Sequence, residues 1–328
     1  MDSKQQEMTP LVSFIITNYN LPVNLLSKCI DSVLALSLRP YEREIIMVDD
    51  GSDLSPINDL VDYDNEIIYV RQKHSGVSIA RNTGIQMARG RYLQFIDGDD
   101  YLLQAAYEHC LDIIRYNQDI DVVLFNFTHS ESLKEATYND SEKMRGADYM
   151  RNHNIQGSVC SCLFRKAARG SLLFTPGIQY GEDEEFTPQL LLRADCICFT
   201  DAKAYFYRTH EASATHQTTA DSKQQRLDDL LTVLLYLHST ADTLPTDERT
   251  ALQRRVAQLT MDYIYKIIIL TRSKQELFTR IESLKSYGLF PLPNKKYTSK
   301  YNWFRRLTNS KTGLLLLLRT LPLMRIEP

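Results

Sequence analysis

The sequence lacks the features that mark a membrane-spanning or an exported, disulfide-bonded protein. Its longest uninterrupted aliphatic run, Leu314–Leu318, is far shorter than the ~20 apolar residues that a membrane-spanning helix needs. The first ten residues contain no apolar stretch of the kind found in a signal peptide. We therefore expect a cytoplasmic protein in which the six cysteines are reduced thiols.

A strong excess of charge of either sign is also missing. The formal net charge of −3 gives no basic field for nucleic acid, so nucleic-acid binding is not expected. Hydrophobic residues make up 43% of the chain and charged residues 24%, as in ordinary globular proteins. The charge is unevenly spread, because residues 283–328 hold nine Lys and Arg residues but one acid, Glu327.

Strand and helix patterns alternate in the first part of the chain. Runs of β-branched or aromatic residues that end at turn residues predict strands at Val12–Thr17, Glu44–Val48, Ile67–Val70, Tyr92–Ile96 and Val122–Phe127. Apolar residues at helical spacing predict helices after Pro22, over Val77–Ala88 and over Leu103–Tyr116. This alternation predicts an α/β fold with a mostly parallel sheet, whose ligands bind beyond the carboxyl ends of its strands.

The chain changes character beyond this alternating part. We expect residues 1–127 to bind a nucleotide, and residues 128–216, which are richer in loops, to form a second part. Residues 217–328 are predicted to be a helical extension, because leucines recur at helical spacing from Leu227 to Leu235.

Carboxylates follow two neighbouring predicted strands. The second strand runs into Asp49-Asp50-Gly51-Ser52-Asp53, and the fourth runs into Asp97-Gly98-Asp99-Asp100. Like charges raise one another's energy unless a cation neutralises them, and hard oxygen ligands suit Mg²⁺ or Mn²⁺. These residues could instead be ordinary turn formers. Both clusters together favour a metal–nucleotide site.

The stretch between the clusters, His74–Gly90, does not fit other nucleotide-binding patterns. Its glycine spacing matches neither the dinucleotide fingerprint nor the P-loop, which argues against a dehydrogenase or a kinase. Gly76 precedes a predicted helix whose first amides could face an anion. Arg81 is a lone cation in that helix, either near the ligand or paired with the acids.

Four stretches of this sequence resemble the family 2 glycosyltransferases of the bacterial polysaccharide type, which are inverting enzymes with the GT-A fold. They read SFIITNYN, EIIMVDDGSD, HSGVSIARNTGIQMARGRYLQFIDGDDYL and YGEDEEF. The resemblance is specific over roughly residues 11–103, weakens through residues 128–216 and is absent beyond. It implies a Rossmann-like nucleotide-binding fold, a nucleotide-sugar donor that we expect to carry UDP, and Mn²⁺ or Mg²⁺.

The resemblance also implies roles for individual residues. Thr17, where the family often has Pro, and Tyr19 fall in the base pocket, and Asp50 falls at the base edge. Asp97 and Asp99 fall on the family's DXD positions, which bind the metal and the diphosphate. The full set of expected donor-binding residues is Thr17, Tyr19, Asn20, Asp49, Asp50, Gly76, Arg81, Asp97, Gly98 and Asp99.

The resemblance implies that residues 128–216 bind the acceptor and carry the catalytic base. The candidate for this base is an acidic run, Glu182-Asp183-Glu184-Glu185. Without context, four adjacent acids predict a solvated surface turn. The family's ED motif matches the first two of them, so the resemblance implies that Asp183 takes the proton of the acceptor hydroxyl, with Glu182 as the alternative base. Glu184 and Glu185 are still expected to be solvated.

Two further groups of residues could bind a metal. The resemblance favours His210, and to a lesser degree Arg208, as a binder of the metal or the diphosphate. The pairs Cys160/Cys162 and Cys196/Cys198 could form a zinc site, but alternation along a buried strand explains them better.

The sequence leaves two interpretations of the basic tail open. The tail could attach to an anionic membrane surface, or it could pack back on the protein as a helix. We expect contact with the cytoplasmic face of a membrane, because the implied acceptors are glycans or lipid-linked glycans.

Two functions compete with glycosyl transfer. The first is that of a sugar-nucleotidyltransferase, which would release pyrophosphate, and the second is that of a non-catalytic module that binds nucleotides or glycans.

Overall fold

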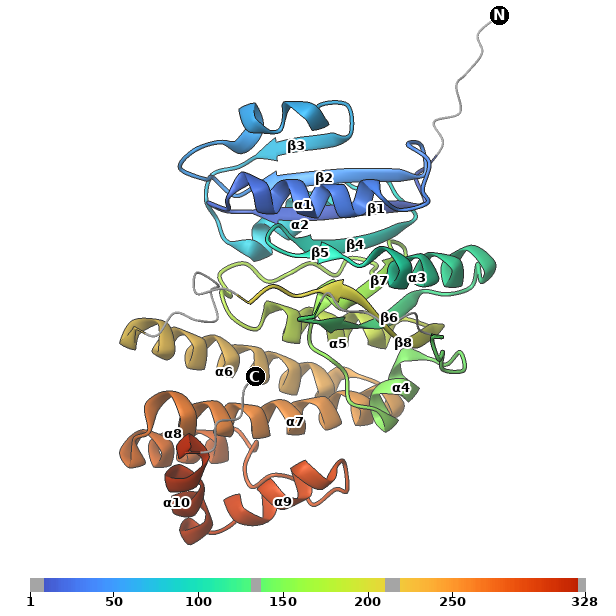
Figure 1. The fold of residues 1–328 in the computed structure, drawn as a ribbon. Helices are drawn as coiled ribbons and strands as arrows, with labels where there is room; N and C mark the ends of the chain where they lie inside the picture. Colours follow the sequence, from blue (N-terminus) through green and yellow to red (C-terminus); the bar gives the residue numbers. More distant parts are fainter. Residues whose placement is uncertain (1–8, 131–136, 210–218, 324–328) are drawn as a thin grey trace, which may run out of the picture. The chain divides into compact units, whose positions relative to one another are not determined.

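The computed structural model describes residues 9–130, 137–209 and 219–323. The chain divides into two compact units (Figure 1). The first comprises residues 1–146 and 156–211, and the second comprises residues 147–155 and 212–328. The predicted three-part division remains a prediction; its first boundary, residue 127, falls within β6 (Val122–Thr128) of the first unit.

The first unit is built on one eight-stranded sheet in the order β3-β2-β1-β4-β7-β6-β8-β5. Strands β1 to β4 are parallel, β7 is antiparallel to both of its neighbours, and β6 and β8 are parallel. The bounds are Val12–Asn18 (β1), Arg43–Asp49 (β2), Ile67–Arg71 (β3), Tyr92–Asp97 (β4), Tyr101–Leu102 (β5), Cys162–Arg165 (β7) and Ile197–Phe206 (β8). This mixed, mostly parallel sheet confirms the predicted fold class and all five predicted strands.

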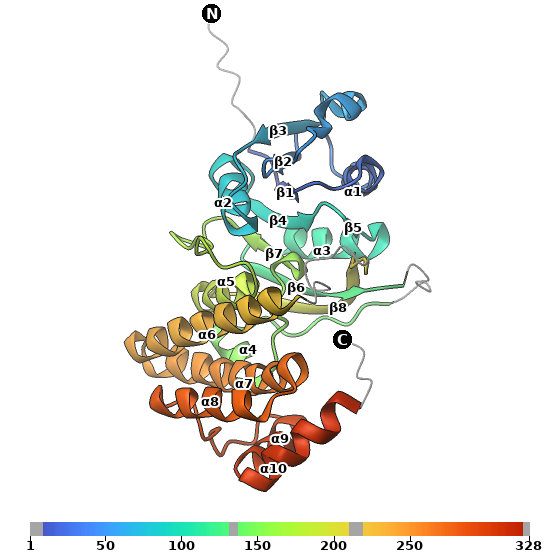
Figure 2. The same cartoon turned by 90° about the vertical axis from the view of Figure 1, so that its left-hand side faces the viewer.

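Helices cover both faces of this sheet. Figure 2 shows α2 (Val77–Met87) on the side opposite α1 (Val23–Leu34) and α3 (Gln104–Tyr116). The predicted apolar face of α1 is buried, with Leu26, Cys29, Ile30 and Val33 fully covered. The remaining helix of this unit is α5 (Glu182–Arg193), and short 3-10 turns lie at Pro56–Asp59, Val61–Tyr63 and Val159–Ser161.

The second unit is helical, as predicted. Its helices are α4 (Gly146–Asn152), whose first residue belongs to the first unit, α6 (Ala220–Thr243), α7 (Thr246–Thr271), α8 (Lys274–Ser286), α9 (Ser299–Thr308) and α10 (Lys311–Thr320), followed by a 3-10 turn at Leu321–Leu323. Among the described residues, no helix is long and apolar enough to cross a membrane.

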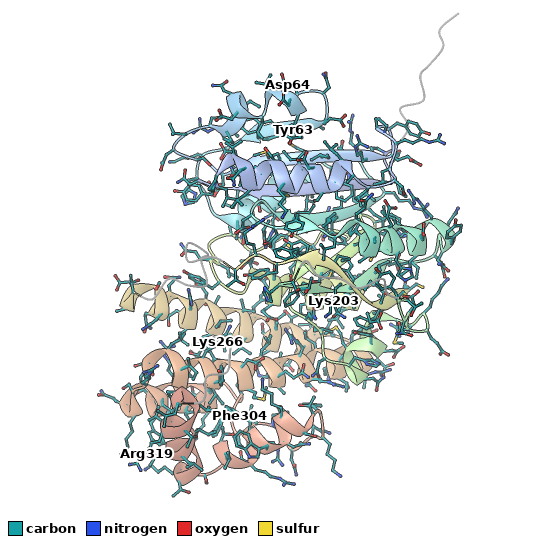
Figure 3. All side chains as sticks on the ribbon, in the orientation of Figure 1. Tyr63, Asp64, Lys203, Lys266, Phe304 and Arg319 are labelled. Atoms are coloured by element: carbon teal, nitrogen blue, oxygen red, sulfur yellow. The ribbon has the colours of Figure 1, made fainter. Side chains whose placement is uncertain are left out.

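The tail helices bury only part of their apolar surface. Tyr301, Phe304, Leu314 and Leu317 are buried in the second unit, so the leucine run is partly a packing element. Figure 3 labels buried Phe304 on α9 and exposed Arg319 on α10.

Candidate active site

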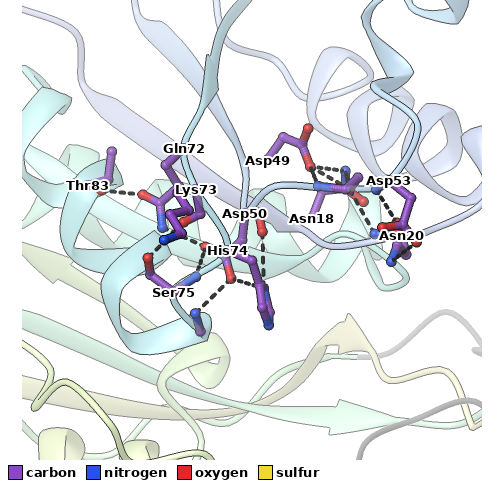
Figure 4. A network of polar contacts seen from close by, with 12 residues as sticks. Asn18, Asn20, Asp49, Asp50, Asp53, Gln72, Lys73, His74, Ser75 and Thr83 are labelled. Atoms are coloured by element: carbon purple, nitrogen blue, oxygen red, sulfur yellow. Dashed lines mark hydrogen bonds and ion pairs between the residues drawn. The ribbon is translucent and has the colours of Figure 1, made fainter.

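Two adjacent aspartates at the end of β2 have different environments (Figure 4). The carboxylate of Asp49 is fully buried and accepts hydrogen bonds from Asn18, Ser52 and Tyr69. Asp50 turns the other way and accepts hydrogen bonds from the backbone amides of Ser75, at 2.9 Å, and Gly76, at 2.8 Å. Asp49 therefore stabilises the strand end, whereas Asp50 fixes the loop that precedes α2.

That loop carries a further candidate site residue, His74, which the sequence did not indicate. The imidazole Nδ1 of His74 lies 2.9 Å from the Asp50 carboxylate, and its ring stacks on Tyr19 with centroids 4.0 Å apart and planes at 17°. Tyr19 is 45% exposed, so the pair presents an aromatic surface at the strand end. His74 does not stand at the spacing of a metal-ligand motif in the sequence, and only the fold brings it next to Tyr19.

The DXD loop follows β4. A side chain at Gly98 would bring a Cβ within 2.8 Å of both the Thr17 carbonyl oxygen and Leu26, so glycine is needed between the two aspartates. Thr17 donates a 3.5 Å hydrogen bond to Asp97. Asn20, with φ of 53°, lies further along the β1 loop and bonds to Asp53.

Asp100, directly after the DXD residues, is part of the support of this loop. Its carboxyl accepts hydrogen bonds from the Tyr205 hydroxyl and the Arg208 amide, both at 2.7 Å. Burial, with the nearby charges of Asp97 and Asp99, raises the pKa of Asp100 to about 8. The raised pKa therefore favours the protonated form of Asp100 at neutral pH.

Arg81 joins the DXD loop to the acidic run. Its guanidinium lies 2.9 Å from Asp97, 2.9 Å from Glu182 and 2.7 Å from Asp183. The side chain is 3% exposed. Burial alone would lower the pKa of Arg81, but Asp183 and Asp97 hold it well above the usual value. The residue is thus a permanent buried cation shared by three carboxylates.

The acidic run is the first turn of α5, which explains why four acids fit there. Gly181 precedes it in the left-handed region, with φ of 90°, and acids in a first turn are stabilised by the helix dipole. Burial raises the pKa of Asp183 to about 8 despite the attraction of Arg81, and burial also raises the pKa of Glu182. Val159 donates its amide hydrogen to Asp183 at 3.2 Å.

The expectation of a solvated turn is wrong for Glu185. Its side chain is buried and accepts a 2.7 Å hydrogen bond from Thr175. Burial raises the pKa of its carboxyl. The helical turn, which the sequence did not indicate, rotates Glu185 into the protein.

The structure describes only some of the remaining candidates for binding the metal or the diphosphate. His210 lies outside the described residues. Arg208 lies beside the DXD loop, where its Nε donates to the Asp99 carbonyl at 2.8 Å and its Nη2 is buried without a hydrogen-bond partner in the described structure. All six cysteines are free thiols; Cys160 lies 3.7 Å from Asp97.

The side chains of Asp97 and Asp99 fit a hard divalent cation that takes only some of its ligands from the protein. No group of three or more His, Cys, Asp or Glu side chains able to hold a metal occurs among the residues that the structure describes. Asp97 and Asp99 supply two carboxylates, and Mg²⁺ commonly takes one or two carboxylates plus phosphate oxygens. A metal here would need further ligands, such as the oxygens of a bound phosphate group.

The arrangement of the sheet and its helices identifies the fold class of the first unit. The mixed, mostly parallel sheet with helices on both faces is a GT-A-like fold. Residues 13–171 match the family model described as "Glycosyl transferase family 2", so this part of the chain belongs to that family.

Known proteins support both the family and the fold. The chain is 32% identical over 224 residues to "Uncharacterized glycosyltransferase EpsJ" of Bacillus subtilis (strain 168). This match covers 63% of this chain and 64% of the length of that relative. The structure of S. aureus TarS 1-349 in complex with UDP-GlcNAc has a TM-score of 0.57 at 15% identity and covers 91% of both chains.

A second solved structure has the same fold. The mannosyltransferase PcManGT from Pyrobaculum calidifontis, in complex with GDP-Man and Mn²⁺, has a TM-score of 0.56 at 12% identity. The match covers 97% of this chain and 88% of that one. At such identities, these likenesses show the GT-A-like fold alone.

Proposed function

We propose that this protein is an inverting glycosyltransferase. It moves a sugar from a nucleotide-sugar donor, expected to carry UDP, to a hydroxyl of a glycan or lipid-linked glycan. The observation that carries the proposal is the contact of Arg81 with both Asp97 and the Glu182–Asp183 pair. Through this contact, the expected diphosphate side and the expected acceptor side lie within the reach of one side chain.

The chemistry is a single displacement at the anomeric carbon. The acceptor oxygen forms a bond to that carbon while the bond from carbon to the diphosphate oxygen breaks, and Asp183 takes the hydroxyl proton. Arg81 and the Val159 amide hold Asp183 in place. A carboxyl with a raised pKa is a stronger base once it is ionised, which suits it to accept this proton.

The diphosphate side is assigned to the DXD loop. Asp97 and Asp99 would hold Mn²⁺ or Mg²⁺, which supplies positive charge to the departing diphosphate. Arg208 is a further candidate there, because its buried Nη2 lacks a partner among the described residues. The Mn²⁺ in the PcManGT structure supports this assignment by analogy of fold.

The nucleoside side is assigned to the strand ends β1 and β2. The stacked pair of Tyr19 and His74 offers an aromatic face to a base, and Asp50 orients His74. Thr17, Asn20 and Gly76 complete the pocket. Asp49 acts indirectly, because its buried carboxylate already accepts hydrogen bonds from Ser52 and from Tyr69 on β3. The UDP-GlcNAc in the TarS structure supports a uridine donor.

Calorimetry with UDP tests the donor site. The variant His74→Ala removes the stacking partner of Tyr19, so UDP affinity should fall about 2- to 12-fold, the value of one aromatic pair at ~0.5–1.5 kcal/mol. The matched control is His153→Ala, which breaks a similar stack with Tyr149 at 4.7 Å in the second unit. Equal UDP affinity in all three proteins would remove His74 from the site.

Product analysis separates the competing enzyme class. A glycosyltransferase releases a nucleoside diphosphate from a nucleotide sugar, whereas a sugar-nucleotidyltransferase releases pyrophosphate from a nucleoside triphosphate. Incubation with UDP-sugars, and separately with UTP and a sugar phosphate, should give only the first product.

The tail helices support a proposal for the location of the protein. Trp303 is 53% exposed and Leu316 is 51% exposed, and the exposed cations Lys300, Arg306, Lys311 and Arg319 lie on the same two helices. Basic residues with exposed apolar side chains suit an anionic membrane surface. We therefore assign α9 and α10 to peripheral contact with the cytoplasmic face of a membrane.

A further inference from the structure

A cavity lies at the edge of the sheet opposite the candidate active site. It has a volume of about 810 Å³ and is lined by the residues that precede three parallel strands and by those that follow β7. The lining includes Leu11, Glu42 and Arg91, directly before β1, β2 and β4, and Lys166 and Arg169 after β7. It is therefore at the amino ends of the strands, whereas Asp50 and Asp97 lie at the carboxyl ends of β2 and β4.

The cavity walls are held together by backbone hydrogen bonds. Arg91 donates its amide hydrogen to the Pro10 carbonyl at 2.8 Å, and Lys166 donates its own to the Arg91 carbonyl at 2.9 Å. Leu11 donates to the Glu42 carbonyl at 2.8 Å. The cavity is therefore formed by the sheet itself, and its volume lies within the ~300–1,000 Å³ of typical ligand pockets.

The charge of this lining is strongly positive. Four of its side chains are cations, namely Arg91, Arg165, Lys166 and Arg169, and one is an acid, Glu42. Arg165 pairs with Asp121 at 3.1 Å. Within the described ranges, the other three cations have no carboxylate partner and bond instead to the carbonyl oxygens of Gln118, Ala88 and Leu172.

Arg169 is the least compensated of these cations. Its Nε is buried and has no hydrogen-bond partner among the described residues. Burial lowers its pKa, with no acid nearby to oppose the shift. A desolvated charge without a counter-charge is costly, and an anion in the cavity would supply the missing partner.

We infer that this cavity is a second binding site, for a phosphate group carried on a saccharide chain. Three uncompensated cations offer more donors than a single carboxylate accepts, whereas the several oxygens of a phosphate can accept from all of them. The volume is larger than a free phosphate needs. Tyr41, which is half-exposed in the lining, offers a ring face to a sugar.

This site would hold an acceptor away from the reaction. β1 has seven residues, which at ~3.3 Å per residue separate the two sheet edges by roughly 20 Å. A long phosphate-bearing acceptor could bind at both edges, and a second contact on one chain raises its effective concentration at the first. This second site rests on the proposed function, and it implies that the acceptor is a saccharide chain that carries phosphate groups.

The test measures binding of inorganic tripolyphosphate, a glycerol-phosphate oligomer and neutral dextran by calorimetry in metal-free, low-salt buffer. Both phosphate compounds should bind the unmodified chain, and dextran should not. Two variants target the cavity: Arg169→Gln removes the uncompensated charge, and Ala167→Glu adds a carboxylate at an exposed lining position. Each should weaken phosphate binding about tenfold or more.

The matched control is Arg193→Gln, because Arg193 also bonds to one backbone carbonyl but does not line the cavity. It should bind phosphate as tightly as the unmodified chain. Undiminished binding by Ala167→Glu and Arg169→Gln, or no binding by the unmodified chain, would overturn the inference. UDP affinity, measured in parallel, should not change in any of these variants, so failure here is distinct from failure of the proposed function.

Discussion

The Nη1 atom of Arg81 lies 2.7 Å from the Oδ1 atom of Asp183, 102 residues further along the chain. The same guanidinium contacts Asp97 at 2.9 Å through Nη2. One buried cation therefore fixes the position of the proposed base relative to the DXD loop. Loss of this cation should affect both folding and catalysis.

Arg81→Met should destabilise the protein. It leaves the carboxylates of Asp97, Glu182 and Asp183 without their shared cation, and breaking a buried ion pair costs about 3–5 kcal/mol. Urea denaturation should show a loss of this size in the free energy of unfolding. Lys143→Gln, which breaks an exposed pair with Asp119, is the control and should unfold as the unmodified chain does. A fully stable Arg81→Met would show that the contact does not hold the fold.

The pH dependence of transfer should follow the ionisation of Asp183. A protonated carboxyl cannot accept a proton, so kcat/KM should rise with pH until it levels off above the raised pKa of about 8. The negative charge of Glu182 is one cause of that raised pKa. Glu182→Gln should therefore shift the rise to lower pH. A rate that falls between pH 6 and pH 8 would contradict this assignment.

The strands and the donor edge could be predicted from sequence because their signals are local. β1 to β4 are apolar runs that end at turn residues, and their carboxyl ends meet at one edge of a parallel sheet. The contacts of Arg81 with the acidic run join positions about 100 residues apart, and no local pattern encodes them. The burial of Glu185 depends in the same way on the helical turn that begins after Gly181.

Asp99→Asn should remove the metal-dependent part of donor affinity. It replaces the charge of a half-buried side chain in the loop after β4 with an amide of the same size, so the fold should survive while Mn²⁺ no longer strengthens UDP binding. Substitution of residues that only hydrogen-bond to metal ligands already lowers metal affinity by about 10–100-fold. We therefore expect calorimetry to show at least a tenfold loss of UDP affinity in the presence of Mn²⁺. The control is Asp112→Asn on α3. If Mn²⁺ strengthens UDP binding equally in both variants, Asp99 is not a ligand.

Membrane contact should depend on the exposed side chains of α9 and α10 rather than on the whole tail. Deletion of the tail would remove the buried Tyr301 and Leu317 and damage the second unit. The double variant Trp303→Glu and Leu316→Glu keeps those contacts and should abolish sedimentation with anionic vesicles at low salt. Tyr116→Glu, at an exposed aromatic residue of the first unit, should sediment normally. The proposal fails if the unmodified chain stays in the supernatant.

The most direct test of the proposed mechanism is sugar transfer to the true acceptor by Asp183→Asn. The amide keeps the size of the side chain but cannot take the proton, so transfer should fall by about 10²–10⁴-fold while UDP affinity is unchanged. Glu182→Gln, at the neighbouring carboxylate that shares Arg81, should lose much less activity. Equal and small losses in the two variants would contradict the assignment of Asp183 as the base.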